Sequence, residues 1–167
     1  MPHILPEVEK TIAFLTSIGI SVKEKPLDDS TFLPGLELGP NALYVDFSKL
    51  KYPGDMLHEA GHIAVTAPNV RSLIGTDTIP EEWPTMGDEI GAILWSYAAL
   101  THLDLPLDFV FHPNGYKGHS QWYMDSFTGG NYIGKPLLQW FKMTSSEEEV
   151  QQGEPAFPAM KNWMRAE

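Results

Sequence analysis

The chain has 167 residues, 43% of them apolar and 11% aromatic, which is enough for one packed core and too little for two ordinary domains. We therefore expect a single domain over residues 1–167. The formal net charge of −11 repels phosphate backbones and anionic lipid headgroups, so nucleic acid is not an expected partner.

Cysteine is absent from the chain, which excludes disulfides, thiol catalysis and zinc sites built from thiolates. Any metal must therefore be held by histidine and carboxylate side chains. The segment 1–7 lacks the basic and apolar regions of a signal peptide, and the most apolar stretch, residues 90–100, has about half the length that spans a bilayer. These features predict a cytoplasmic protein without a membrane partner.

The first third of the chain is expected to hold one helix and a small sheet. Apolar residues recur at helical spacing over residues 7–18 and predict an amphipathic helix. Residues 20–25 alternate apolar and charged side chains, and residues 42–46 follow a turn, so both segments predict strands. Residues 32–38 predict a third strand, at an edge or with a bulge because the segment contains proline and glycine.

Two longer helices are predicted in the middle of the chain. Asp55 is a good N-cap residue and opens an apolar helix over residues 56–67, which a proline ends. Residues 68–84 contain turn formers and predict a loop. A capping box at Thr85 then opens a helix that reaches about residue 102 and is apolar nearly all round, which indicates a buried helix.

The pattern is weaker in the last third. Residues 109–111 predict a strand, residues 112–115 a turn, and residues 120–127 and 136–143 short helices. Residues 145–149 give another capping signal with a solvated acidic face. The whole pattern predicts an α+β domain in which a small, mostly antiparallel sheet packs on the two middle helices.

The helix predicted over residues 56–67 contains the sequence His58-Glu59-Ala60-Gly61-His62. Two imidazoles four residues apart lie one turn above each other and can chelate one zinc ion. Glu59 is then angled toward the water that the metal polarises. A carboxylate can act there as general base, because zinc lowers the pKa of that water to about 7. Zn²⁺ is the expected cofactor, and other divalent transition metals suit the same ligands.

Chance is a weak explanation of this motif. Composition alone gives about 0.02 matches in a chain of this length. The remaining residues of the helix are mostly apolar, and burying two histidines and a glutamate there without a partner would be costly. The alternative interpretation is a pair of core histidines hydrogen-bonded to the backbone.

The motif resembles that of the zincin metallopeptidases. The five-residue sequence is similar to the form found in the ATP-dependent membrane proteases, although their ATPase and membrane anchor have no counterpart in these 167 residues. The stretch Glu89-Ile90-Gly91-Ala92 is similar to the E-x-x-A helix of the ImmA/IrrE-like metallopeptidases and of gluzincins, which supplies their third ligand. The resemblance covers about residues 42–106 and implies a zincin-like fold, peptidase activity and Glu89 as a metal ligand.

One departure from the family pattern concerns the support of the ligands. Some gluzincins have an acidic residue four places after the glutamate, whereas Ile93 stands there in this chain. We therefore expect another carboxylate or a backbone carbonyl to orient His58 or His62.

The residues themselves leave the third ligand open. Glu89 is favoured because it begins a buried helix without a local role, whereas Asp88 is the capping partner of Thr85. The preference of a helix N-terminus for negative charge would make Glu89 merely structural. The other candidates are Asp77, Glu81, Glu82, Asp88, His102, His112 and His119.

Two glycines bear on the same choice. Gly61 and Gly91 lie inside the two predicted helices, where each costs about 1 kcal/mol relative to alanine. We expect the helices to cross near these glycines, so that Glu89 can reach a metal held by the two histidines. Ordinary packing of small residues is the alternative.

A hydrolase of this kind also needs a donor opposite the metal to stabilise an oxyanion. Residues 112–123 concentrate donors among glycines, and His119, Tyr116 and Tyr123 are the candidates. We expect His119 and Tyr123 to be catalytic beside Glu59, although turn residues and core aromatics explain the same segment.

The sequence thus predicts a small zinc-dependent hydrolase that acts on peptide or protein substrates. His58, His62 and Glu89 are the expected ligands, Glu59 is the expected general base, and a fourth position stays open for water. No particular substrate or oligomeric state follows from the sequence. A metal-stabilised binding or regulatory module without turnover would instead use a fourth protein ligand, and a metal-free interaction protein is the third hypothesis.

Overall fold

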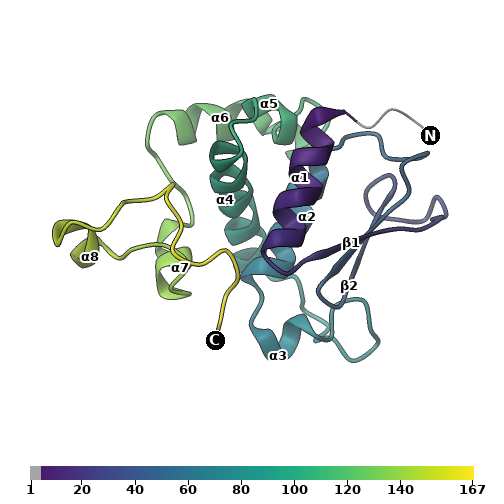
Figure 1. Cartoon of the computed structure of the whole chain (residues 1–167), viewed down its shortest axis with the longest axis horizontal. Coiled ribbons are helices and arrows are strands. Elements are labelled where there is room, and N and C mark those ends of the chain that lie inside the picture. The colour runs from purple at the N-terminus through teal and green to yellow at the C-terminus, as the bar shows by residue number, and fades with distance from the viewer. Residues whose placement is uncertain (1–4) are drawn as a thin grey trace.

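Long helices stand beside a small sheet, with shorter helices at the edges (Figure 1). The computed structural model describes residues 5–167. The segment 1–4, which belongs to the stretch inspected for a signal peptide, lies outside the described residues. In chain order the elements are α1 Pro6–Ser17, β1 Ser21–Glu24, β2 Leu36–Gly39, β3 Ala42–Val45, α2 Asp55–Val65, α3 Pro68–Arg71, α4 Met86–His102, α5 Leu107–Val110, the 3₁₀ helix η1 Tyr116–Gly118, α6 Ser120–Thr128, α7 Lys135–Trp140 and α8 Glu147–Gln151.

The sheet has the strand order β1-β3-β2 and is mixed. β1 runs parallel to β3, with Ser21 opposite Ala42, and β2 runs antiparallel to β3, with Leu36 opposite Val45. The predicted α+β class is confirmed, but the expectation of a mostly antiparallel sheet is wrong. A two-residue turn joins β2 to β3 and forces them antiparallel, whereas the longer connection after β1 lets that strand pair in the parallel sense.

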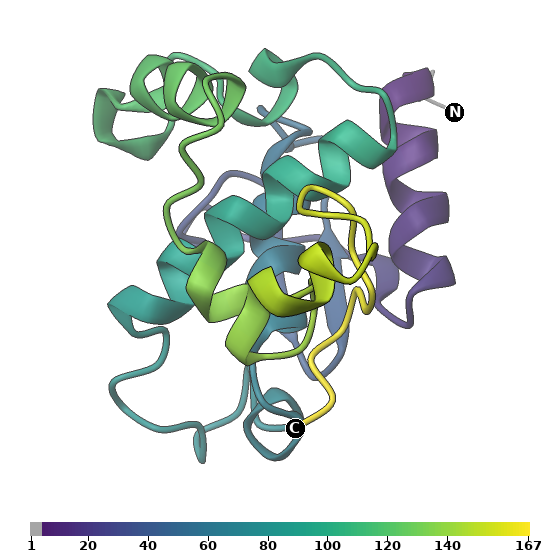
Figure 2. The ribbon, with the colours of Figure 1, turned by 90° about the vertical axis from the view of Figure 1, so that its left-hand side faces the viewer.

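α2 lies at the centre, where it packs against α1, α4 and the strands β2 and β3. Seen from the side, α4 crosses in front of α2, and the C-terminal segment runs across α4 (Figure 2). The core formed there contains Leu15, Leu43, Leu57, Ile63, Leu94 and Trp95, all fully buried. Burying such side chains contributes about 1.5–3 kcal/mol each, so this core is a main source of the stability of the fold.

α4 begins as its sequence predicts. The Thr85 hydroxyl accepts from the Asp88 amide, and the Asp88 carboxylate accepts from the Thr85 amide. All residues from Gly91 to Leu100 are buried, which confirms the prediction of a buried helix. The capping box thereby fixes where the first turn of α4, including Glu89, begins.

Several local predictions differ from the structure. Residues 109–111 do not form a strand, because Pro106 is the N-cap of α5 and starts a helical turn there. The loop predicted over residues 68–84 contains the short helix α3. The helix predicted over residues 136–143 is shorter, since α7 ends at Trp140.

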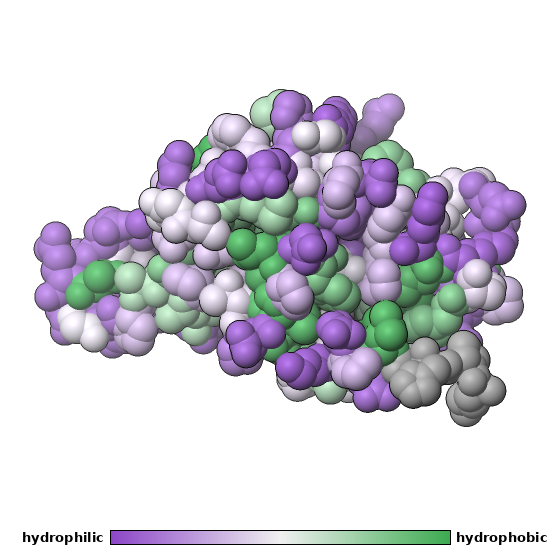
Figure 3. Space-filling model, turned by 90° about the horizontal axis from the view of Figure 1, so that it is seen from above, coloured by the Kyte–Doolittle hydropathy of each residue, from purple (hydrophilic) through white to green (hydrophobic). Residues whose placement is uncertain are grey.

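The face seen from above shows apolar surface near its middle with polar side chains around it (Figure 3). Large exposed apolar side chains within residues 5–167 include Phe32, Met86 and Trp140. Within the same residues, the structure has no helix with both the length and the apolar character that crossing a bilayer requires.

Candidate metal centre

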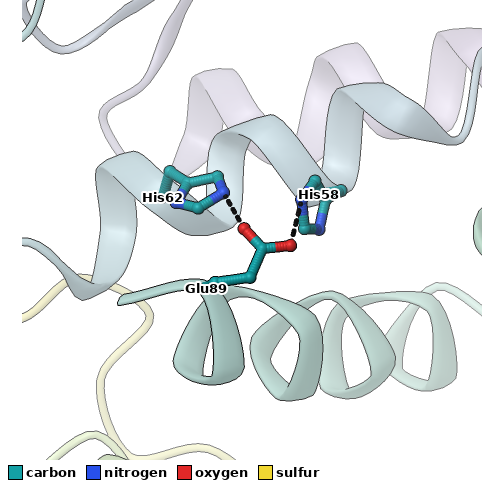
Figure 4. Close-up of side chains that lie close together, drawn as sticks. All are labelled: His58, His62 and Glu89. Carbon is teal, nitrogen blue, oxygen red and sulfur yellow. Dashed lines mark ion pairs between the residues drawn. The ribbon is translucent and has the colours of Figure 1, made fainter. Parts of the chain in front are cut away.

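Three side chains from two helices meet where α2 crosses α4 (Figure 4). The His58 Nε2 atom lies 3.2 Å from one carboxylate oxygen of Glu89, and the His62 Nε2 atom lies 2.8 Å from the other. One potential ligand atom of each residue lies within 4.8 Å of those of the other two. Two imidazole nitrogens and a carboxylate oxygen at this spacing could hold one metal ion.

The local structure explains why these side chains converge. His58 and His62 are four residues apart in α2 and so occupy the same helix face. Glu89 follows the capping box directly, in the first turn of α4. Each helix therefore presents its ligand atoms without any irregular backbone.

The backbones of α2 and α4 come close together at Gly61. A β-carbon at this position would lie 2.7 Å from the Ala92 carbonyl oxygen, which is far inside van der Waals contact. At Gly91 a β-carbon would lie 3.6 Å from a Val65 methyl group, which is an ordinary contact. The expected close approach is confirmed at Gly61, whereas Gly91 shows ordinary packing.

Glu89 and His58 each shift the pKa of the other. Burial disfavours the charged form of Glu89, but hydrogen bonds and charges from His58 and His62 outweigh it and hold the Glu89 pKa far below its usual value. Burial likewise disfavours protonated His58, but the hydrogen bond and charge of Glu89 outweigh it and raise the His58 pKa. The carboxylate thus stays ionised, and a cation that binds here competes with a proton for His58.

Glu59 lies beside the cluster without joining it. Its carboxylate oxygen is 4.0 Å from the His58 Nε2 atom, and its side chain is largely buried. Burial is the largest cause of a raised Glu59 pKa, and the nearby histidines oppose it. A raised pKa makes this carboxylate a better proton acceptor than an exposed glutamate.

Apart from Glu89, which contacts the Nε2 atoms, the two imidazoles pack against aromatic rings. Among residues 5–167 neither the His58 nor the His62 Nδ1 atom has a hydrogen-bond partner, so the expected carboxylate or carbonyl support is not found. The Tyr116 ring packs edge-on against His58 at 5.3 Å between centroids, and the Trp83 ring packs against His62 at 6.0 Å. Trp83 is itself fixed, because its Nε1 donates to the Thr66 hydroxyl.

A second buried pair lies one turn before His58. Asp55 is not an N-cap as the sequence predicts: Gly54 takes that position, and the Asp55 carboxylate lies 2.8 Å from the His112 Nε2 atom. The Tyr52 ring stacks on His112 at 4.1 Å. Burial raises the Asp55 pKa, and His112 opposes the rise. The spacing of Asp55 to His58, one helical turn, was a usable signal for this missed residue.

A cleft of about 390 Å³ opens onto the cluster. One wall comes from the connection between β1 and β2, and the other from the turn before α6. The lining residues are Phe32, Leu33, Pro34, Tyr52, Asp55, His58, Glu89, His112, Asn114, Gly115, Tyr116 and Lys117. Sequence reasoning did not identify the contributions of Phe32, Tyr52 and Lys117, since nothing in the local pattern links them to the motif.

The predicted oxyanion donors lie at different depths. His119 is exposed and is not among the residues that line the cleft. Tyr123 is half-buried, and its ring packs 5.6 Å from that of Tyr116. The Tyr116 hydroxyl is buried, and this burial, with the charges of nearby carboxylates, raises its pKa well above the usual value. Catalytic roles for His119 and Tyr123 stay predictions.

The other candidates for the third ligand do not join the cluster, which consists of His58, His62 and Glu89. His112 is paired with Asp55, and Asp88 completes the capping box. The remaining candidates are all exposed: Asp77, Glu81, Glu82, His102 and His119.

Comparison with known proteins gives no assignment, because no family model matches the chain and no match was found among curated proteins or solved structures. The chemistry of the cluster and its cleft is therefore the basis for a functional assignment. Two histidines and one glutamate from separate helices converge there beside a buried carboxylate.

Proposed function

We propose that this chain is a metal-dependent hydrolase, most simply a zinc peptidase of the zincin type. The observation that carries the proposal is the convergence of His58, His62 and Glu89 within 4.8 Å, with Glu59 beside them and a cleft in front. A purely structural ion pair would explain the cluster, but it would require neither the adjacent buried Glu59 nor an opening to solvent.

Two histidines and a glutamate are a ligand set that suits zinc with one position left open. The same donors also suit nickel, cobalt and iron. When bound, zinc acts as a Lewis acid and lowers the pKa of a coordinated water to about 7.

The residues of the chain would divide the work of hydrolysis. His58, His62 and Glu89 fix the position of the ion, and the rings of Tyr116 and Trp83 fix the imidazoles. Glu59 would accept the proton of the attacking water and pass it to the leaving amine. The wall of the cleft would hold the peptide in an extended form over the cluster.

We also propose a structural family and a cellular location for the protein. The two crossing helices and their ligands support a zincin-like fold of the gluzincin or ImmA/IrrE-like type, and peptides or proteins are the proposed substrates. The absence of cysteine agrees with a cytoplasmic location.

The test compares zinc-loaded wild-type protein with the Glu59→Gln variant. Glutamine keeps the size of the side chain but cannot accept the proton, so metal content should stay the same while peptide hydrolysis falls by at least about 10²-fold. Metal is measured by mass spectrometry, and cleavage is measured on a peptide library. Glu148→Gln, at an exposed position on α8, is the matched control and should cleave like the wild type.

The other outcomes separate the alternatives. Equal hydrolysis by wild type and Glu59→Gln would remove Glu59 as general base. A protein that retains one metal ion but cleaves no peptide would be a metal-stabilised binding or regulatory module. A protein that retains no metal after purification without chelator would be a metal-free interaction protein.

A further inference from the structure

The cleft in front of the cluster has an uneven distribution of charge. Its lining includes the carboxylates of Asp55 and Glu89 and only one lysine or arginine, Lys117. Asp55 is paired with His112 and Glu89 with the motif histidines. Among residues 5–167, Lys117 forms no ion pair or side-chain hydrogen bond, and its side chain is exposed. Lys117 is therefore the one charge of this cleft that is left for a ligand.

The backbone holds Lys117 in a conformation that a lysine does not favour. Tyr116 has a φ of 57° and Lys117 a φ of 54°, both in the left-handed region where glycine is the usual residue. Non-glycine residues in such conformations gather at functional sites, where surrounding contacts enforce them. A glycine at position 117 would adopt this conformation without strain, so placing a lysine there has a conformational cost.

The contacts around the turn explain how the conformation is enforced. The Tyr116 ring packs against the rings of His58 and Phe111. The Ser120 hydroxyl donates to the His112 carbonyl oxygen at 2.6 Å, and the Gly118 amide donates to the Gly115 carbonyl oxygen. Lys117 is thus presented from a fixed turn whose neighbouring residue touches a proposed metal ligand.

The facing wall offers apolar surface. Phe32 is 96% exposed, although it lines the same cleft together with Pro34 and Tyr52. An exposed phenylalanine beside a cleft is a typical contact for an apolar or aromatic ligand side chain. The cleft therefore combines an apolar wall with one cation.

We propose that Lys117 is a specificity residue that binds a carboxylate of the substrate, so that the enzyme acts on peptides with a negative charge beside an apolar residue. This inference rests on the proposed metal site. The carboxylate has two sources, an acidic side chain or a free C-terminus. The net charge of −11 repels such peptides at long range, so their selection requires a local cation of this kind.

The test uses zinc-loaded protein and peptides that carry a metal-binding hydroxamate group at the N-terminus. Four probes share an initial phenylalanine and differ in the next residue: glutamine amide is neutral, glutamate amide has an acidic side chain, glycine with a free carboxylate has an acidic C-terminus, and lysine amide is cationic. Their dissociation constants are measured by calorimetry at low ionic strength. Binding is thereby read without any need for hydrolysis.

Wild-type protein should bind at least one anionic probe about two- to fivefold more tightly than the neutral probe, the range of an exposed ion pair. The preference should weaken in high salt. The anionic probe that is preferred identifies the source of the carboxylate. Lys117→Arg should keep the preference, Lys117→Gly should lose it, and Lys117→Glu should reverse it in favour of the cationic probe.

Lys142→Gly is the matched control. Lys142 also has a left-handed backbone, with a φ of 59°, but it lies outside this cleft. Removing this lysine changes backbone strain and net charge just as Lys117→Gly does, and the preference for the anionic probe should survive.

Equal binding of anionic and neutral probes by the wild type would overturn the inference, as would an unchanged preference in Lys117→Gly. Failure of all four probes to bind would also overturn it, because the cleft would then take no ligand at the metal. A clear preference without any peptide hydrolysis would contradict the proposed hydrolase and leave the role of Lys117 standing.

Discussion

Glu89 has two partners because its carboxylate bridges two imidazoles one helical turn apart. Each oxygen faces a different histidine, at 3.2 Å and 2.8 Å, and the side chain is still 44% exposed. This carboxylate is ionised, contacts an imidazole on each side and is open to solvent, so it is well placed to bind a metal ion together with the two histidines. The residue joins the capped start of α4 to the motif of α2.

Loss of a ligand should lower metal affinity and stability together. We expect about one transition-metal ion per wild-type chain, no retained metal in His58→Ala or His62→Ala, and weakened binding in Glu89→Ala. Because metal binds the folded state alone, added zinc should raise the melting temperature of the wild type and not that of the histidine variants. Mass spectrometry and thermal unfolding with and without zinc measure both effects. Unchanged metal content in Glu89→Ala would move the third ligand elsewhere.

Residues of the site were predictable where a local spacing defines them. The spacing of His58 and His62 fixes their common face, and the position of Glu89 follows from the start of α4. Asp55 was misread as an N-cap because its partner, His112, lies 57 residues away. The left-handed backbone of Lys117 is likewise imposed by tertiary contacts, so no local pattern reveals it.

At the scale of elements, the crossing of α2 and α4 depends on one missing side chain. Gly61 lets the backbone of α2 approach Ala92, whereas Gly91 faces Val65 at ordinary distance. The two positions are thus a natural pair for an experiment. Both positions are glycines at the contact between α2 and α4, but they differ in the space available for a β-carbon.

Gly61→Ala should destabilise the protein and weaken metal binding, because the new methyl group forces the helices apart at a cost of about 1–3 kcal/mol. Gly91→Ala should be neutral or stabilise the protein by up to about 1 kcal/mol through helix propensity. Urea unfolding and zinc titration of both variants check this contrast. Similar effects from the two substitutions would show that the close contact is not at Gly61.

Helices with a continuous pattern were predictable, and the sheet was predictable only in part. α4 has its own capping box and apolar composition, so its location follows from local sequence. The pairing of β1 with β3 joins segments about 20 residues apart, and local alternation does not define its direction. The sequence Phe109-Val110-Phe111 favours a strand, but the turn begun by Pro106 places Phe109 and Val110 in α5, whose C-cap is Phe111. Val110 and Phe111 are buried there.

At the scale of the whole molecule, Arg71 ties the C-terminal segment to the helix of the motif. Its buried guanidinium donates to the Ile63 carbonyl at 3.0 Å and the Thr66 carbonyl at 2.9 Å. It also donates to the carbonyl of Arg165, whose own amide donates to the Ala64 carbonyl. The last carbonyls of α2 are therefore satisfied by residues outside the helix.

Arg71→Met should lower the free energy of unfolding by about 2–4 kcal/mol, because several buried carbonyl groups lose their donor and each costs about 1–3 kcal/mol when some are left unsatisfied. The loss should extend to metal affinity, since α2 carries both histidines. Lys51→Met, at an exposed lysine, is the control for a lost charge and should unfold at the wild-type urea concentration. Equal midpoints for the two variants would contradict this role of Arg71.

The C-terminal segment is also joined to α8 by a pair that responds to pH. Lys161 Nζ donates to the Glu149 carboxylate, which also accepts from the Ser146 amide. The hydrogen bond from Lys161 is the largest cause that lowers the Glu149 pKa from its usual 4.5 to about 2. Folding therefore favours the ionised form, and the stabilisation is complete above pH 4.5 and disappears as the pH falls toward 2.

Glu149→Gln should thus melt below the wild type at pH 6, and the gap between the two melting temperatures should narrow as the pH falls below 4.5. Glutamine can still accept from the Ser146 amide, so the substitution mainly removes the charge. The pair is exposed, so the gap should be small and should shrink in high salt. Scanning calorimetry between pH 6 and 3 measures it. In a Lys161→Met background the gap should depend less on pH, because the chief cause of the low pKa is gone. A gap that stays constant over this range in the wild-type background would show that Glu149 does not stabilise the fold through its charge.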